Sequence, residues 1–343
     1  MQRALPTALL ALVLAATASA QEGKRPLFES EAPLAVTLQA PWSDLLKNTK
    51  DPKRHPAVLE FADAQGPHRL DATVETRGLT RLRLCRFPPL KLRFAKGVGE
   101  GSVFAKQDEL KMVTHCDRGQ AYAQYYVQEW LAYRIYNLVT DRSFRARPLE
   151  VTYRDSLGAK PNGPHFAFVI EETGDMAKRV GLKRDAKTSF VPGDFEPLAL
   201  SRFMLFQYLI GNTDWDVTLG PRKEECCHNV RVLGEGAGGR IAVPYDFDTA
   251  GLVNANYVAP HASLPIEYVT ERLYRGFCAH NGALEAARQE YLGKRAAIMA
   301  LVQGERRLSA TRQRELAKFV EAFYETLASD EKFAREISGK CRK

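Results

Sequence analysis

The sequence predicts an α+β protein with two lobes, the first rich in β-strands with one long helix and the second mostly helical. Short segments with alternating apolar and polar residues recur between residues 34 and 113, which is typical of half-buried strands. An amphipathic segment at 120–140, and several more after residue 197, have the three- and four-residue spacing of helices. The 343 residues are enough for one large domain or two lobes.

The first 20 residues have the pattern of a secretory signal peptide. Arg3 supplies the positive charge, residues 9–16 are apolar, and Ala18-Ser19-Ala20 is a small-residue cleavage site. The apolar run is too short to span a membrane, and no later segment is long and apolar enough to do so. We therefore expect a secreted or periplasmic protein that begins near Gln21 and has no transmembrane segment.

The formal net charge of +8 is compatible with a solvated basic surface or with attraction to anionic partners. The chain has no repeat of aromatic and basic residues of the kind that marks nucleic-acid binding, so we expect no nucleic-acid partner. The sequence leaves the oligomeric state open.

All six cysteines lie after the signal peptide, and an even number in an oxidising compartment predicts disulfides. We favour a Cys85–Cys116 pair because both residues lie in the N-terminal half, and Cys278 could pair with Cys226 or Cys227. No CxxC spacing occurs, so a zinc site is not predicted.

The β-rich lobe is predicted to span residues 21–172. Turn residues such as Gly66-Pro67 and Gly78 separate its strands. The expected strands lie at 34–38, 58–61, 70–77, 90–94, 110–113, 149–153 and 165–171, and the long helix lies at 120–140.

The helical lobe is predicted to span residues 173–343. A short surface helix falls within 174–187, and a core helix at 197–210 begins at Pro197 with Asp194 as its cap. Further helices are expected at 264–275, 284–303, 310–327 and 330–337, with Ser309 and Ser329 as N-caps. A β-rich lobe with one long helix followed by a helical lobe is the outline of a protein-kinase-like fold.

The candidate site lies in residues 211–248, where oxygen-bearing side chains follow two apolar segments. Asp214 comes after the core helix, Asn229 opens a short apolar run, and Asp246 and Asp248 flank Phe247 after a strand. Hard oxygen ligands suit Mg²⁺ and a phosphate better than zinc. Alternatively, Asp214 and Asn229 are simple turn residues. Two carboxylates after a buried strand are costly, however, unless a cation or hydrogen-bond donors meet them.

This stretch, with GNTDWD, HN and PYDFD, resembles the GNxD…N…DxD pattern of the CotH-type kinases, which are spore-coat and secreted atypical kinases. It is more distantly similar to the HipA-type kinases, which carry GNxDxHxxN followed by a YD element. The RG dipeptide at 77–78, KLRF, the long helix and VIEE come in the CotH-type order, so the resemblance covers residues 70–258.

The resemblance implies that Asp214 is the catalytic aspartate and that Asn229, Asp246 and Asp248 hold the metal ion. It implies Mg²⁺ or Mn²⁺ with ATP or another nucleotide as cofactors. The phosphoryl group would pass to a hydroxyl of a protein or small molecule.

A lysine tied to a helix glutamate would hold the phosphates from the other side. We predict that Lys91 is the lysine that holds the phosphates, with Glu129 as its partner on the long helix. The nearby alternatives are Lys96, Lys106 and Lys111.

The chain departs from the family pattern in two places. Fifteen positions separate Asp214 from Asn229, where the families have several, so either a loop is inserted or Asp216 is the catalytic aspartate. No glycine-rich phosphate loop precedes Lys91, and only the RGLT turn at 77–80 could serve.

Two other functions stay open at this point. One is a catalytically inactive envelope or surface scaffold with the same fold, which binds a partner or glycan and holds a structural cation such as Ca²⁺. The other is a metal-dependent phosphoesterase, although the ligands of a second metal site are not evident.

Overall fold

The computed structural model describes residues 26–49, 53–117, 119–158, 160, 162–220 and 226–343. The predicted signal peptide at 1–20 therefore lies outside the described residues. Most of the expected elements occur in the described part, but their arrangement differs from the expectation.

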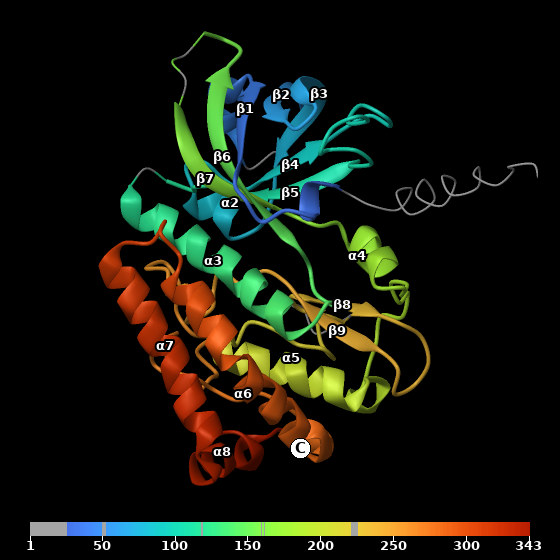
Figure 1. The fold of residues 1–343 in the computed structure, drawn as a ribbon, viewed down its shortest axis with the longest axis vertical. Helices are drawn as coiled ribbons and strands as arrows, with labels where there is room; N and C mark the ends of the chain where they lie inside the picture. Colours follow the sequence, from blue (N-terminus) through green and yellow to red (C-terminus); the bar gives the residue numbers. More distant parts are fainter. Residues whose placement is uncertain (1–25, 50–52, 118, 159, 161, 221–225) are drawn as a thin grey trace, which may run out of the picture.

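Seven strands form a closed barrel in the order β1-β2-β3-β4-β5-β7-β6 (Figure 1). They are β1 (Leu34–Ala40), β2 (His55–Asp63), β3 (Gly66–Thr76), β4 (Leu90–Arg93), β5 (Glu109–Val113), β6 (Ala146–Asp155) and β7 (Asn162–Ile170). All neighbouring pairs are antiparallel except β1 and β6, which run parallel from Leu34↔Leu149 to Ala40↔Asp155.

The predicted protein-kinase-like two-lobed fold is wrong. The first part of the chain closes into a barrel, because the later strand β6 pairs with β1. This pairing removes the two edges that an open sheet would leave. Alternation along each strand indicates which face is buried, but it does not say which strands pair. The β1–β6 pairing joins segments more than 100 residues apart, so nothing local in the sequence announces it.

The barrel interior is one apolar cluster, built from the inward-facing alternate residues of each strand. In β1, for example, Val36, Leu38 and Ala40 are buried. The buried residues Val74, Leu90 and Val151 continue this core on other strands.

A second, larger core lies between the long helix α3 (Gln120–Val139) and the elements that follow the barrel. Figure 1 shows α3 between the barrel and the helices of the C-terminal part of the chain. The other helices are α1 (Trp42–Leu45), α2 (Arg81–Leu84), α4 (Thr173–Arg179), α5 (Pro197–Ile210), α6 (Asn281–Gln303), α7 (Ala310–Ala328) and α8 (Asp330–Glu336). A two-stranded hairpin, β8 (Val230–Leu233) with β9 (Ile241–Pro244), packs on α5.

Most of the predicted helix boundaries are confirmed. Ser309 and Ser329 cap α7 and α8 by accepting hydrogen bonds from backbone N–H groups. The cap of α5 is Glu196 rather than Asp194. The helix expected at 264–275 is wrong, because this segment consists of turns and extended chain. Its Arg272 donates hydrogen bonds to the backbone carbonyl groups of residues 208 and 209, at the end of α5.

Three disulfides join the six cysteines. The predicted Cys85–Cys116 bond is confirmed. Cys226 bonds to its neighbour Cys227, and Cys278 bonds to Cys341, so the predicted pairing of Cys278 with either of the adjacent cysteines is wrong. Such bonds are compatible with an oxidising compartment. Among the described helices, none is both long and apolar enough to cross a membrane.

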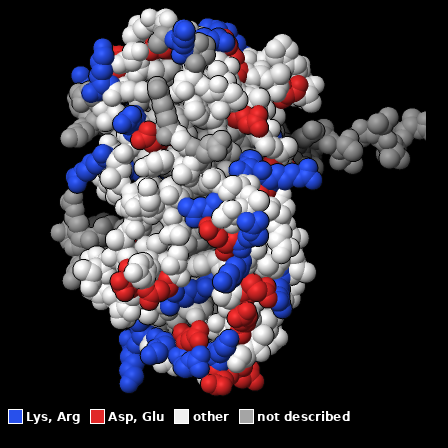
Figure 2. All heavy atoms as spheres, turned by 90° about the vertical axis from the view of Figure 1, so that its left-hand side faces the viewer, with Lys and Arg blue, Asp and Glu red and all other residues white. Residues whose placement is uncertain are grey.

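The face shown in Figure 2 carries both signs of charge. Lys and Arg side chains lie among Asp and Glu side chains over the helical part, with uncharged surface between them. On this face the basic residues are thus interspersed with acidic ones, as expected for a solvated charged surface.

We expect Leu38→Ala in β1 to lower the free energy of unfolding by about 2–5 kcal/mol, because it removes a fully buried side chain from the strand that closes the barrel. The neighbouring substitution Gln39→Ala, on the outward face, should change it by less than about 1 kcal/mol. Urea unfolding measures both values. Equal losses in the two variants would contradict the assigned orientation of β1.

Candidate functional site

A buried arginine, Arg81, lies at the centre of a cluster of three carboxylates. Its guanidinium pairs with both oxygens of Glu129 at 3.1 and 3.2 Å. It also reaches an oxygen of Asp246 at 3.0 Å and one of Asp248 at 2.9 Å. The Arg81 and Glu129 side chains are only 7% and 1% exposed, so this pair is almost entirely removed from water.

Three separate elements supply the Arg81 cluster. Arg81 belongs to α2, in the connection between β3 and β4 of the barrel, and Glu129 lies on α3. One turn further along α3, Tyr133 accepts a hydrogen bond from the backbone N–H of Asp246 at 3.0 Å. Phe247 is buried against Tyr133, with ring centroids 4.6 Å apart, and this contact holds the two flanking aspartates against the cluster.

A second network surrounds Asp214. His228 Nε2 lies 2.6 Å from one of its carboxylate oxygens. The side-chain amide of Asn229 donates to the Asp214 backbone carbonyl at 2.8 Å and to the other carboxylate oxygen at 3.1 Å. The Thr249 hydroxyl, directly after Asp248, reaches the same carboxylate at 3.5 Å. The two networks are therefore adjacent.

The local backbone explains why these side chains meet. Helix α5 ends at Gly211, which has φ +62°, and an added Cβ there would lie 3.1 Å from the Phe319 ring. The β8–β9 hairpin then brings Asn229 and Asp246 together at its open end, where the Tyr245 N–H donates to the Asn229 carbonyl. Asn229 and Asp246 have φ of +52° and +64°, a left-handed conformation that costs free energy and often occurs at functional sites.

The Arg81 cluster is electrostatically unbalanced. Burial raises the pKa of Glu129 to about 8 despite the opposing charge of Arg81. Burial and the neighbouring carboxylates likewise raise the pKa of Asp248 to about 6. Burial alone would lower the pKa of Arg81, but the three carboxylates raise it further, so the guanidinium stays charged.

Asp214 and His228 stabilise each other's charged forms. Burial raises the pKa of Asp214, but the hydrogen bonds from His228, Asn229 and Thr249 outweigh it and lower the pKa below its ordinary value. The hydrogen bond to Asp214 is the largest cause of the raised pKa of His228. Asp214 is therefore an ionised carboxylate whose orientation is fixed by three donors.

Positive groups gather around Tyr245, the residue before Asp246. Lys111 Nζ lies 5.8 Å and the Arg231 guanidinium 4.2 Å from the centre of its ring. Burial, together with the charges of Arg77 and Arg231, lowers the pKa of Lys111 to about 8. Two basic side chains thus lie against the ring of the residue that precedes Asp246.

The structure separates the predicted phosphate-binding pair. Lys91 lies 3.2 Å from Glu109 and 3.8 Å from Glu75 on the barrel, while the cation that faces Glu129 is Arg81. Lys91 is the register partner of Lys111 on β5, one of the alternative lysines.

Asp216, the alternative to Asp214, belongs to a different network. Its carboxylate accepts hydrogen bonds from the Thr218 N–H and hydroxyl and from Arg342 at 2.7–3.1 Å. These contacts hold the loop that follows α5. Asp214, Asn229, Asp246, Asp248 and Glu129 are thus the predicted residues that the fold brings together.

Sequence reasoning missed Arg81, His228 and the basic group at Tyr245. Arg81 directly follows the RGLT turn at 77–80, which is the candidate turn for phosphate binding. Its position in the sequence could therefore have marked it as a residue of the site. His228 belongs to the HN dipeptide of the motif, and its place beside Asp214 depends on the loop geometry. The group of Lys111 and Arg231 joins two distant strands and has no local signal.

Within the described part of the chain, no group of three or more His, Cys, Asp or Glu side chains is arranged to hold a metal ion. This finding is compatible with Mg²⁺, which is usually held by one or two carboxylates together with phosphate oxygens and waters. The carboxylates of Asp246 and Asp248, with the amide oxygen of Asn229, are oxygen ligands of the kind that Mg²⁺ takes.

A search against protein-family models and a search of curated proteins each found no match. The similarity to CotH-type and HipA-type kinases thus stays a prediction from short motifs.

We expect Asp214→Asn to lower the pKa of His228 toward its ordinary value, because the substitution removes the charge of its hydrogen-bond partner. The pair stabilises the folded state fully below the ordinary His pKa and loses this contribution as pH rises through the raised value. Toward acid, the contribution is lost as pH falls through the lowered pKa of Asp214. An NMR titration of His228 measures the change, and Glu315→Gln on α7 is the control. An unchanged pKa in Asp214→Asn would contradict the assigned pair.

We expect Arg81→Met to lower the free energy of unfolding by about 3–5 kcal/mol at pH 8, because it leaves buried carboxylates without a counter-charge. The raised pKa values of Glu129 and Asp248 mean that the folded state takes up protons as pH falls. The loss should therefore be smaller at pH 5.5. Chemical denaturation at both pH values tests this, with Arg81→Lys as the charge-retaining control. A loss that does not depend on pH would count against the charge imbalance.

Proposed function

We propose that this protein is an exported phosphotransferase that binds a nucleotide with Mg²⁺ or Mn²⁺ and transfers a phosphoryl group to a hydroxyl of a protein or small molecule. The observation that carries the proposal is the charge imbalance at Arg81. Three carboxylates facing one guanidinium leave two excess negative charges when all are ionised. Glu129 and Asp248 are largely enclosed whereas Asp246 is 38% exposed, and an excess of negative charge on enclosed groups is offset by protons or by a bound cation.

Asp246 and Asp248, with the Asn229 amide oxygen, would hold the metal ion. When bound, the ion would bridge phosphate oxygens and neutralise their charge. Arg81 holds the side chains of the two aspartates next to each other, because it binds one oxygen of each. Glu129 in turn positions Arg81 through its two hydrogen bonds.

Asp214 would accept or orient the hydroxyl that attacks the phosphorus. Its lowered pKa keeps the carboxylate ionised near neutral pH, so it can accept the hydroxyl proton or a hydrogen bond from it. The donors on His228, Asn229 and Thr249 fix its direction. Phosphoryl transfer depends mainly on such positioning and on charge stabilisation.

The basic group at Tyr245 would face the phosphates. Lys111 and Arg231 share the Tyr245 ring, and that residue directly precedes Asp246. These cations are better placed than Lys91, whose charge is already offset by Glu75 and Glu109. The arrangement supports a site with anionic metal ligands on one side and phosphate-binding cations beside them.

A second candidate is a catalytically inactive envelope or surface protein that binds a partner. The observation that favours it is the direct contact of Arg81 with both Asp246 and Asp248. In that case the guanidinium itself is the permanent counter-charge, and the cluster only joins the barrel to the helical part.

Export rests on the signal-like residues 1–20 and on the three disulfides. ATP is scarce outside the cytoplasm. The nucleotide test therefore includes several nucleoside triphosphates and diphosphates.

We expect Mg²⁺ with a nucleotide to raise the melting temperature of the wild-type protein. At a ligand concentration of 100 Kd, the added stability is about 2.7 kcal/mol. Asp246→Asn should abolish the shift because it removes a metal-binding charge, whereas Glu315→Gln on α7 should retain it. If the wild type shows no shift with any nucleotide and either Mg²⁺ or Mn²⁺, the phosphotransferase proposal fails and the inactive protein is favoured.

The same samples then test transfer. With a γ-labelled nucleoside triphosphate, the wild type should incorporate label into itself or an added hydroxyl acceptor. Asp214→Asn should reduce the rate by about 10²–10⁴-fold while the thermal shift is retained, because a proton acceptor contributes to the transition state and not to nucleotide binding. Loss of binding in Asp214→Asn would contradict this division of roles.

A further inference from the structure

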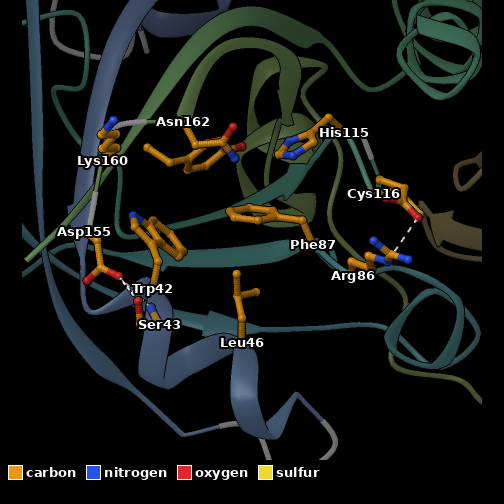
Figure 3. Close-up of a pocket in the computed structure, with 12 residues that line it drawn as sticks. Trp42, Ser43, Leu46, Arg86, Phe87, His115, Cys116, Asp155, Lys160 and Asn162 are labelled. Atoms are coloured by element: carbon orange, nitrogen blue, oxygen red, sulfur yellow. Dashed lines mark hydrogen bonds and ion pairs between the residues drawn. The ribbon is translucent and has the colours of Figure 1, made fainter. Parts of the chain in front are cut away.

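A cavity of about 370 Å³ lies at one end of the barrel, away from the residues assigned to phosphoryl transfer. Its walls come from α1 and the turn after it, from the end of β6, from the segments after α2 and β5, and from the start of β7. Figure 3 shows the side chains of Trp42 and Phe87 at its centre, with Lys160 and Arg86 on opposite sides. The full lining is Trp42, Ser43, Leu46, Arg86, Phe87, His115, Cys116, Asp117, Tyr153, Asp155, Lys160 and Asn162.

The inner wall of the cavity is aromatic and rigid. The Phe87 ring lies 5.3 Å from Trp42, 4.4 Å from Tyr153 and 4.7 Å from His115, measured between ring centres. The Trp42 indole N–H donates to the Leu38 carbonyl at 3.2 Å, so the ring offers its apolar surface rather than a donor. Such a wall favours a planar, apolar ligand.

The acidic side chains at the rim are already engaged. Asp155 accepts hydrogen bonds from the Ser43 N–H at 2.8 Å, from the Ser43 hydroxyl, and from the Leu157 N–H at 2.9 Å. Asp117 lies 3.7 Å from the Arg86 guanidinium. The hydrogen bonds fix the direction of the Asp155 carboxylate, which stays ionised, and the charge of Asp117 is paired with that of Arg86.

Lys160 and Arg86 are the two cations of the lining, and Asp117 and Asp155 are its two carboxylates. The Lys160 side chain is exposed at the rim, and within the described part of the chain it has no ion-pair partner. Figure 3 places its ammonium on the same side of the cavity as Asp155, whose oxygens face Ser43. The formal charges of the lining balance, and Lys160 is the cation at the rim that a ligand carboxylate can pair with, because the oxygens of Asp155 are already held by Ser43 and Leu157.

We propose that this cavity binds a small aromatic carboxylate, with its ring against Trp42 and Phe87 and its carboxylate toward Lys160. Removal of the ring from water supplies most of the affinity, because the aromatic wall is rigid and apolar. An ion pair at an exposed rim contributes little, so Lys160 adds a preference for the anion of roughly two- to fivefold.

The test compares 4-chlorobenzoate with its neutral analogue 4-chlorobenzyl alcohol by calorimetric titration into the full mature chain. Both compounds should bind the wild type, and the carboxylate should bind roughly two- to fivefold more tightly. Lys160→Gln should remove this difference and leave binding of the alcohol unchanged. Lys318→Gln, an exposed lysine on α7, is the matched control and should retain the difference.

Tryptophan fluorescence locates the bound compound. The chain has three tryptophans, and of these Trp42 lines the cavity while Trp130 and Trp215 lie in the larger core. Binding should change the emission of the wild type, and Trp42→Phe should remove that change while the calorimetric heat persists. The proposal is overturned if neither compound binds, if both bind equally to the wild type, or if the emission change survives in Trp42→Phe.

Discussion

The contact of one buried arginine with three carboxylates links the barrel to α3 and to the segment after β9. Arg81 comes from a barrel connection, Glu129 from α3, and the two aspartates from the segment after β9. Apolar packing also joins the two parts, because the larger core includes Val113, Phe168 and Ile170 of the barrel strands together with α3. The Cys85–Cys116 disulfide ties the end of α2 to the segment after β5, which limits how far Arg81 can move. Removing one partner from a buried ion network of this kind is costly, because it leaves an uncompensated buried charge.

The Asp214 network differs in kind from the Arg81 network. Asp214 is 45% exposed, so solvent or an acceptor can reach its carboxylate, whereas Glu129 is enclosed. Its neighbours are hydrogen-bond donors and a histidine rather than a guanidinium. The Asp214 carboxylate is thus accessible from outside, whereas the carboxylates of the Arg81 cluster are fixed by ion pairs with the guanidinium. This division, with the cations at Tyr245, is the arrangement on which the proposal of phosphoryl transfer rests.

The segment from Arg81 to Phe87 connects the two proposed sites. Arg81 at one end faces the carboxylates, and Phe87 at the other end forms the wall of the aromatic cavity. Between them Cys85 is bonded to Cys116, which also lines the cavity. Both sites therefore depend on the same short connection between β3 and β4. Its conformation is fixed by a disulfide, by the antiparallel bridge between Phe87 and Cys116, and by the buried ion pairs.

The sequence by itself determined most of the secondary structure and much of the carboxylate set. Alternation marks the strands because side chains on a pleated strand face opposite sides, and Asp246 and Asp248 stand out because a buried strand precedes them. It could not determine that β1 pairs with β6, since pairing between distant strands leaves no local pattern. That closure replaced the predicted two-lobed fold with a barrel. Only the tertiary structure placed Arg81 rather than Lys91 against Glu129, because the choice among many basic residues depends on which one the folded chain buries.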